Sequence, residues 1–320
     1  IVFAGVGKTA SEIEYALKTG ILMFNVESSQ ELQVINEVAG RIGKKAAIAI
    51  RVNPDIDPQT HPYITTGLKQ NKFGIDILRA PMVYRLASEL PNLKVIGIDC
   101  HLGSQLMDVE PIVEALKKLK DLVENLKKEG MEIRYLDLGG GLGITYGDEE
   151  PPHPVEYASN ILEEIRDFGC TLILEPGRVI VGNAGILVSK VLNLKENEEK
   201  RFIVVDAAMN DLVRPSYYGS FHQILPVKDE NREEIVADVV GPVCESADFL
   251  AKGRKLPRLN PGELLAIMSA GAYGFSMASN YNSRPRVAEV LVRDDQMFVI
   301  RQRESYEDLI RGEEIPEFLV

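Results

Sequence analysis

Three short motifs, each at the end of an apolar run, constrain this chain more than any other feature of its sequence. They are residues 101–105 (HLGSQ), 136–143 (LDLGGGLG) and 174–178 (LEPGR). Because the carboxyl ends of parallel strands face the same side of an α/β fold, we expect the three endings to meet at one site. That site would gather a glycine-rich loop, an imidazole, a carboxylate and a guanidinium. Such a set suits a phosphorylated, ring-shaped cofactor.

The first part of the chain alternates apolar runs with amphipathic helical stretches, a pattern typical of βα units and a parallel sheet. Six runs are predicted strands: residues 1–4, 22–26, 46–52, 93–100, 134–138 and 171–175. The spacing of Ser11 with Glu14, and of Ser28 with Glu31, is that of a helix-capping box. Six units fit either a doubly wound sheet or an eight-stranded barrel that lacks two strands. A first residue inside an apolar run favours the second, a (β/α)8 (TIM) barrel truncated at its N-terminus.

The second part of the chain has a different texture. Its apolar runs are rich in β-branched residues and are separated by turn residues: 186–191, 202–205, 235–240, 264–268, 287–292 and 297–300. A length of 320 residues also exceeds what one hydrophobic core usually organises. We therefore expect an α/β domain over residues 1–178 and a mainly antiparallel β-domain over residues 179–320.

The composition narrows the kinds of partner. A formal net charge of −12 would repel nucleic acid and anionic membrane surfaces, which leaves a small-molecule enzyme as the better fit. The three cysteines, Cys100, Cys170 and Cys244, have no metal-ligand spacing and point to a reducing compartment. No long apolar or signal-like segment occurs, so we expect a cytosolic protein. The histidines show no metal-like spacing either, and we expect no metal site; besides His101 they are His61, His153 and His222.

Each candidate residue at the strand ends has two interpretations. Gly140 and Gly141, with their glycine neighbours, either let an anion approach the backbone or only make a tight βα turn. Glu175 either holds a protonated pyridine nitrogen or forms a structural ion pair with Arg178, whose guanidinium suits a carboxylate or phosphate. His101 suits stacking on a ring or proton exchange, although a lone histidine is usually structural. All these alternatives stay open at the level of single residues.

Ser104, and Cys244 in the β-rich half, also have two interpretations each. Ser104 would bind a phosphate or cap a turn. Cys244, beside Glu245, would donate a proton or be a small buried hydrophobic residue, and the residues alone favour burial. Arg214 suits a second substrate carboxylate, and Tyr273 lies in a glycine-flanked turn.

Six segments, taken in order, resemble the motif series of the diaminopimelate decarboxylases, which are group IV pyridoxal phosphate (PLP)-dependent decarboxylases with the alanine-racemase-like fold. The segments are HLGSQ, LDLGGGLG, LEPGR, MNDLVRPSYYGS, GPVCESADFL and GAYGFSMASNYNSRPR. The resemblance extends from Ile1 to near the C-terminus. It implies a PLP-binding (β/α)8 barrel followed by a β-domain, and a homodimer with shared active sites. It also implies a carboxy-lyase that converts meso-2,6-diaminopimelate to L-lysine and carbon dioxide, the last step of lysine biosynthesis.

The resemblance assigns roles to residues of this chain. His101 would stack on the PLP ring and Glu175 would pair with its nitrogen, with Pro176, Gly177 and Arg178 completing that loop. The phosphate would be held by Ser104, Gly140, Gly141 and Tyr273. The distal end of the substrate would be held by Arg178, Arg214, Tyr218 and Glu245, with Tyr273 nearby. Cys244 would protonate the carbanion, and Cys244 and Glu245 would come from the opposite subunit.

One family feature is missing from these residues. The lysine that forms the Schiff base with PLP lies, in the family, in a motif at the first barrel strand, and no such motif occurs here. We expect it upstream of Ile1, and we expect this segment alone to be inactive. Lys72 is the internal substitute, but its position resembles a structural one. The alternative functions are a decarboxylase for carboxynorspermidine, ornithine or arginine, a non-catalytic regulatory paralogue, and a module that only binds a phosphate-bearing ligand.

Overall fold

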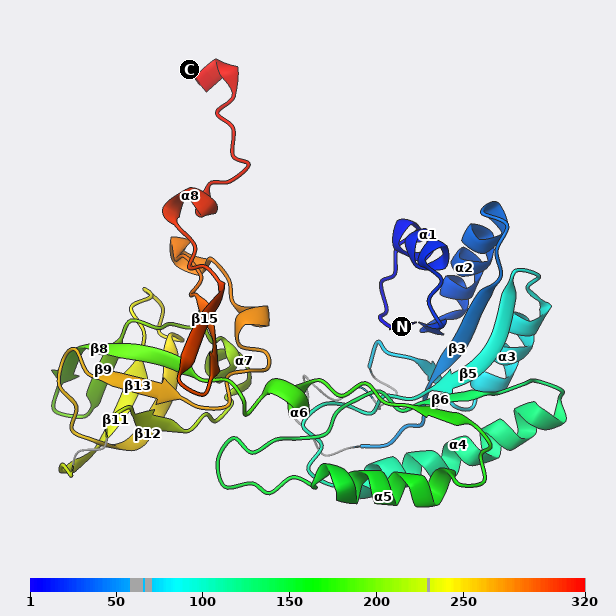
Figure 1. Cartoon of the computed structure of the whole chain (residues 1–320), viewed down its shortest axis with the longest axis horizontal. Coiled ribbons are helices and arrows are strands. Elements are labelled where there is room, and N and C mark those ends of the chain that lie inside the picture. Colours follow the sequence, from blue (N-terminus) through cyan, green and yellow to red (C-terminus); the bar gives the residue numbers. More distant parts are fainter. Residues whose placement is uncertain (58–65, 67–70, 229–230, 320) are drawn as a thin grey trace. The chain divides into compact units, whose positions relative to one another are not determined.

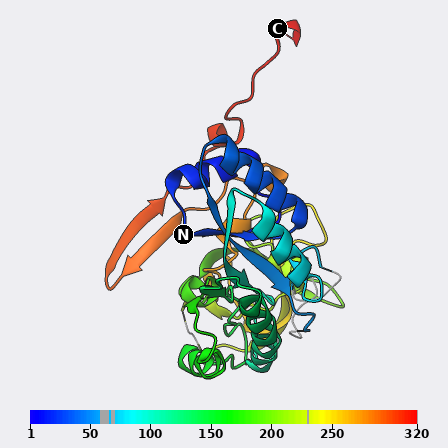
Figure 2. The same ribbon diagram turned by 90° about the vertical axis from the view of Figure 1, so that its right-hand side faces the viewer.

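The structure, a computed structural model, describes residues 1–57, 66, 71–228 and 231–319. The chain divides into two compact units, shown in Figures 1 and 2. The first unit comprises residues 1–144 and 150–179, and the second comprises residues 145–149 and 180–320. Each unit is described by itself.

A parallel sheet forms the centre of the first unit. Its strands are β1 (Val2–Phe3), β2 (Met23–Val26), β3 (Ala46–Asn53), β5 (Leu93–Asp99), β6 (Tyr135–Asp137) and β7 (Thr171–Ile173), hydrogen-bonded in this order. Every neighbouring pair is parallel, and β4 (Ile75–Asp76) pairs with the end of β3. All six predicted strands are confirmed, each within two residues of its expected ends. This parallel, half-barrel sheet is the arrangement that the truncated-barrel prediction requires.

Helices connect the strands. They are α1 (Ala10–Thr19), α2 (Ser29–Arg41), α3 (Ala80–Glu89), α4 (Glu110–Lys128), α5 (Pro154–Ile165) and the short α6 (Arg178–Val181). Helices α4 and α5 lie against one another, as Figures 1 and 2 both show. Pro111 is in the first turn of α4, where the missing N–H of proline costs no hydrogen bond. Successive strands of this sheet are joined by α1 to α5 and are parallel neighbours, as in repeated βα units.

The two faces of the sheet have different chemistry because side chains alternate along a strand. Phe24, Ile48 and Ile98 lie on one face, in the main core that the helix side chains cover. On the other face, Met23 and Ala49 belong to a second, small apolar cluster with Ile96. Further along, near the carboxyl ends, the buried residues of that second face become polar: Asn25, Arg51, Asp99 and Asp137. The polar and charged side chains of the sheet therefore lie on its second face, near the carboxyl ends of the strands.

The predicted capping box at the start of α1 is wrong by two residues. The N-cap is Thr9, whose side chain and that of Glu12 form the reciprocal bonds, whereas Glu14 pairs with Lys18 and Arg41. For α2 the predicted N-cap is confirmed, since the Ser28 hydroxyl accepts the Glu31 N–H.

The second unit is mainly antiparallel. Its six-stranded sheet has the order β10 (Ile224–Pro226), β13 (Leu264–Ile267), β8 (Leu187–Glu196), β9 (Arg201–Val205), β11 (Glu234–Val240) and β12 (Phe249–Pro257). Only the pair β9–β11 is parallel within this sheet. A hairpin of β14 (Glu289–Arg293) and β15 (Gln296–Arg301) forms a separate two-stranded sheet, drawn in orange in Figure 2. The sequence predicted neither β10 nor β12.

Short helices and turns position side chains in the second unit. Helix α7 (Arg214–Tyr218) is one turn long, and the 3-10 helices η1 (Phe275–Met277) and η2 (Tyr281–Ser283) follow β13. Helix α8 (Tyr306–Leu309) and η3 (Glu317–Leu319) come after the hairpin. The core of this unit is formed by β-sheet residues such as Val191, Ile203 and Leu265.

Candidate active site

The ends of β5, β6 and β7 meet, as the three motifs predict. Backbone hydrogen bonds continue beyond the paired strands: Cys100 N–H donates to the Asp137 carbonyl (2.9 Å), and Glu175 N–H donates to the Gly139 carbonyl (2.7 Å). These bonds extend the pairing of neighbouring strands into the loops that follow them, so the three motifs lie side by side in the first unit.

The glycine motif fits between the other two without space for a side chain. A Cβ on Gly140 would lie 2.2 Å from the carbonyl oxygen of Glu175. A Cβ on Gly141, which also has a φ of +113°, would lie 2.4 Å from the carbonyl oxygen of Gly103. Only glycine permits this approach of three loops. The loops therefore form a rigid backbone surface at the strand ends.

His101 is mostly enclosed at this edge. Its Nδ1 accepts a hydrogen bond from the Gly140 N–H (3.2 Å), which places the proton of the neutral ring on Nε2. Burial, and then the positive charge of Arg51, lower the pKa of His101 to about 4. The imidazole is therefore neutral near pH 7, and its carbonyl group is fixed by the Thr66 hydroxyl (2.7 Å).

Ser104 and Arg178 are brought together. Nη2 of Arg178 donates to the Ser104 hydroxyl oxygen (2.9 Å), and the Arg178 side chain is buried. The pairing joins the HLGSQ and LEPGR motifs by side chains as well as by backbone. Pro176 and Gly177 are exposed between Glu175 and Arg178.

The carboxylates at this edge outnumber the cations. Burial and the neighbouring Asp137 carboxylate raise the pKa of Glu175 to about 7, although part of Glu175 faces solvent. Burial, and then Asp137, also raise the pKa of Asp99 well above its usual range. The buried cation nearby, Arg51, forms an ion pair with Glu27 (2.7 Å). A further positive charge next to Glu175 would thus be strongly stabilised.

Sequence reasoning missed the polar residues that support Glu175. The Asp137 carboxylate accepts the Asn25 side-chain amide (3.0 Å) and the Gly139 N–H (2.9 Å). Asn25 and Arg51 alternate with core residues on β2 and β3, and polar residues at such positions of apolar strands are the signal that could have identified them. Which of them touch is set by strand order, which the sequence does not give.

In the second unit, Arg214 is buried at the start of α7 and has a defined set of neighbours. Its Nη1 lies 3.1 Å from Nε2 of His222, and its guanidinium lies 4.5 Å from the centre of the Tyr146 ring. Nδ1 of His222 lies 2.8 Å from the Met268 carbonyl oxygen, so Nδ1 carries the proton and Nε2 accepts from Arg214. The sequence had given neither Tyr146 nor His222 a part in this site.

The other predicted residues of the second unit lie on loops or short helices. Cys244 is exposed, so the burial that its sequence context favoured is wrong. Glu245 is exposed beside it, and the ring of Tyr218 packs edge-on against Tyr217. Tyr273 has a φ of +56°, which is uncommon for a tyrosine and typical of functional turns.

No group of three or more His, Cys, Asp or Glu side chains in the described part of the chain could hold a metal ion. No helix within the described ranges is long and apolar enough to cross a membrane. His61 lies outside the described residues.

Comparisons with known proteins agree on one family. Residues 1–182 match the pyridoxal binding domain of the pyridoxal-dependent decarboxylases. The diaminopimelate decarboxylase of Aquifex aeolicus is 53% identical over 311 residues, which cover 97% of this chain and 74% of that protein.

Solved structures show the same likeness. The diaminopimelate decarboxylase of Helicobacter pylori, complexed with L-lysine, superimposes with a TM-score of 0.93 at 48% identity, covering 97% of this chain and 78% of that one. The M. jannaschii diaminopimelate decarboxylase, in co-complex with L-lysine, gives a TM-score of 0.94 at 42% identity, covering 100% of this chain and 75% of that one.

Proposed function

This chain belongs to the pyridoxal-dependent decarboxylases, and on that premise we propose how its residues carry out the reaction of a diaminopimelate decarboxylase. The protein is a PLP-dependent carboxy-lyase that acts on meso-2,6-diaminopimelate and forms L-lysine and carbon dioxide. The observation that carries the assignment of roles is the position of Glu175, a carboxylate of raised pKa beside a glycine cradle and a neutral imidazole.

The glycine loop fits a phosphate. Gly140 and Gly141 have no side chains that could keep a ligand from the backbone of this loop, although the Gly140 N–H already donates to His101. Backbone N–H groups and a nearby hydroxyl are the donors that phosphate groups prefer. We assign Gly140, Gly141 and Ser104 to the phosphate, and Tyr273 of the second unit to the same group.

Glu175 fits a protonated pyridine nitrogen. Its pKa is raised because burial and Asp137 disfavour its charge, and a cationic ring nitrogen would compensate both. When bound, PLP supplies the electron sink that takes the electron pair left by the departing carboxylate. Glu175 keeps the proton on the ring nitrogen. Pro176 and Gly177 complete its loop, and the neutral His101 ring stacks on the cofactor.

Substrate recognition is assigned to a second set of side chains. Arg178 and Arg214 suit the substrate's distal carboxylate because a guanidinium binds a carboxylate through two parallel hydrogen bonds. Glu245 suits the distal ammonium, and Tyr218 and Tyr273 supply hydroxyl groups. The exposed thiol of Cys244 delivers a proton from its Sγ to the carbon that loses the carboxylate.

We also propose an assembly, a domain assignment and a location. Residues 1–178 would form the PLP-binding domain and residues 179–320 the β-domain. The exposed positions of Cys244 and Glu245 support a homodimer in which these two residues complete the site of the partner. The net charge of −12, together with three free cysteines among the described residues, supports a cytoplasmic protein.

Replacing Arg214 tests the substrate assignment. We expect Arg214→Met to raise the KM for meso-diaminopimelate roughly 10- to 100-fold, because one partner of the distal carboxylate is lost. The cofactor's visible absorbance and dissociation constant are expected to stay at wild-type values. Unchanged turnover of meso-diaminopimelate by Arg214→Met would refute the role of Arg214.

A further inference from the structure

Tyr281 has no part in the roles assigned above, yet it forms a close contact with one of the assigned residues. Its hydroxyl donates a hydrogen bond of 2.5 Å to Oε2 of Glu245. Both side chains are on the surface of the second unit, and 47% of Tyr281 is exposed. Holding two exposed side chains in one arrangement costs conformational entropy, and a backbone that is already fixed on both sides lowers that cost.

The backbone of Glu245 is fixed by Asp248. The buried carboxylate of Asp248 accepts the N–H groups of Val243 (2.7 Å) and Met209 (2.7 Å), and the Asp248 N–H donates to the Glu245 carbonyl (3.0 Å). The Ser216 hydroxyl donates to the Ala247 carbonyl (2.5 Å). The loop that carries Cys244 and Glu245 is therefore hydrogen-bonded both to the backbone at Met209 and to helix α7.

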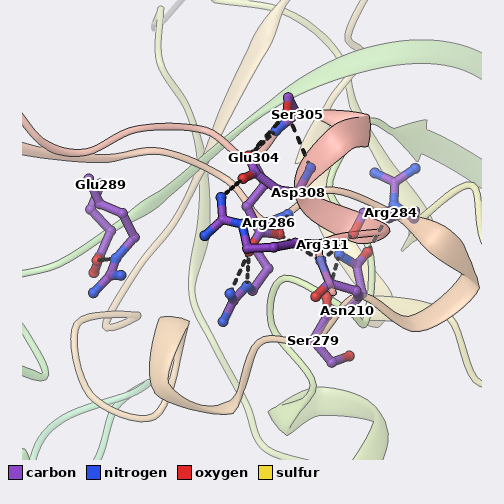
Figure 3. A network of polar contacts seen from close by, with 11 residues as sticks. Asn210, Ser279, Arg284, Arg286, Glu289, Glu304, Ser305, Asp308 and Arg311 are labelled. Atoms are coloured by element: carbon purple, nitrogen blue, oxygen red, sulfur yellow. Dashed lines mark hydrogen bonds and ion pairs between the residues drawn. The ribbon is translucent and has the colours of Figure 1, made fainter. Parts of the chain in front are cut away.

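Asn210 fixes the segment that carries Tyr281, the other partner of this contact. The Asn210 side chain accepts from Nε of Arg284 (2.9 Å), and its backbone carbonyl accepts the N–H of Ser279 (2.9 Å), so that it holds residues on both sides of Tyr281 (Figure 3). Asn210 is buried and precedes the Arg214 segment in the chain.

Glu304 provides the second anchor of that segment. Its carboxylate accepts the Arg286 N–H (2.8 Å) and Nε of Arg286 (2.7 Å), as Figure 3 shows. It also accepts the side-chain amide of Asn280 (2.6 Å). These bonds lower the pKa of Glu304 to about 2, with the Arg286 side chain as the largest cause. The carboxylate is thus ionised at all working pH values, and the anchor persists.

The geometry points to Tyr281 as a positioning residue for the substrate's distal ammonium group. By holding Oε2, the hydroxyl fixes the rotation of the Glu245 carboxylate. No described residue makes a hydrogen bond or ion pair with Oε1, which is left to accept from a ligand. Pre-orienting a carboxylate lowers the entropy lost when a ligand binds, and so favours binding rather than the chemical step. This inference rests on the proposed function, because Glu245 contacts substrate only in that assignment.

The test is Tyr281→Phe in the complete protein with PLP bound. We expect the KM for meso-diaminopimelate to rise roughly fivefold to twentyfold, with kcat within about twofold of wild type. The dissociation constant of L-lysine, which keeps both the ammonium and the carboxylate at its distal end, is expected to rise by a similar factor in calorimetry. In a Glu245→Ala background, Tyr281→Phe is expected to add less than about twofold, because its partner is already gone.

Tyr306→Phe is the matched control, since Tyr306 is 74% exposed and its hydroxyl bonds none of the described residues. We expect wild-type constants for it and equal thermal melting for all three proteins. A Tyr281→Phe effect on kcat alone, or an effect of equal size with and without Glu245, would overturn the inference. An inactive wild-type protein would instead overturn the proposed function.

Discussion

At the strand ends, neighbouring protein groups set the protonation state of single side chains before any ligand binds. His101 is neutral because burial lowers its pKa to about 4, and the Gly140 N–H fixes its tautomer. A neutral ring stacks on a cationic ring without charge repulsion, which an imidazolium would not do. The residue that sequence reasoning could describe only as a lone histidine therefore has one protonation state near pH 7.

Glu175 makes the stability of the cofactor-free protein depend on pH. Its pKa in the folded protein is about 7, against 4.5 for an ordinary glutamate. Between these values the folded state keeps a proton that the unfolded state releases, so the free energy of unfolding falls as pH rises from about 4.5 to about 7. Glu175→Gln does not titrate and is expected to lack this fall, which solvent screening limits to about 1 kcal/mol.

Urea unfolding of the cofactor-free wild type and Glu175→Gln at about pH 5 and about pH 8 measures this difference directly. Titration of the groups that do not interact with Glu175 is common to both proteins and cancels. The account predicts that wild type loses more stability than the variant on going to the higher pH. An equal loss in both would show that Glu175 has an ordinary pKa.

At the scale of elements, the glycine loop is the segment least tolerant of change. A Cβ on residue 140 would come within 2.2 Å of the Glu175 carbonyl oxygen, so the loop or the end of β7 must move. We expect Gly140→Ala to weaken PLP binding at least about 100-fold and to destabilise the protein by about 2–4 kcal/mol. Equilibrium dialysis of PLP and denaturant unfolding measure the two effects.

Gly7→Ala is the matched control, because a Cβ there would meet nothing within 4 Å. It is expected to bind PLP with wild-type affinity and to unfold within about 1 kcal/mol of wild type. If Gly140→Ala binds PLP as tightly as Gly7→Ala does, the loop is not the phosphate site.

Periodicity was sufficient to predict β1, β2, β3, β5, β6 and β7 of the first unit, but not the start of helix α1 or every strand of the second unit. Both Thr9 with Glu12 and Ser11 with Glu14 match the capping-box spacing, and the choice is made by Lys18 and Arg41, which engage Glu14. Strand β12 escaped prediction because its run of residues, FLAKGRKLP, contains a glycine and three cations that interrupt the apolar alternation.

The candidate site, too, could be predicted from the sequence only in part. The motifs gave the loops that meet at the strand ends, because parallel strands place their carboxyl ends together. They did not give the contact between Asn25 and Asp137, which are 112 positions apart and touch only because β2 and β6 belong to one sheet. Nor did they give the contact between Tyr281 and Glu245, which depends on anchors in three separate segments.

At the scale of the whole molecule, a shared active site predicts recovery of activity from two inactive variants. Cys244→Ala and Glu175→Ala are each expected to be inactive as homodimers. Dissociated and reassociated together, they form mixed dimers in half of the assemblies, each with one intact site, so about one quarter of wild-type activity is expected. Each variant carried through the same procedure alone is the control. If the mixture stays as inactive as the separate variants, each site is built from a single chain.

The central claim is the reaction itself, and product release measures it most directly. The complete gene product, with PLP, is incubated with meso-diaminopimelate or with ornithine, and carbon dioxide and the amine product are quantified. The account predicts equimolar carbon dioxide and L-lysine from meso-diaminopimelate and no release from ornithine. Release from ornithine, or from neither substrate with PLP bound, would contradict it.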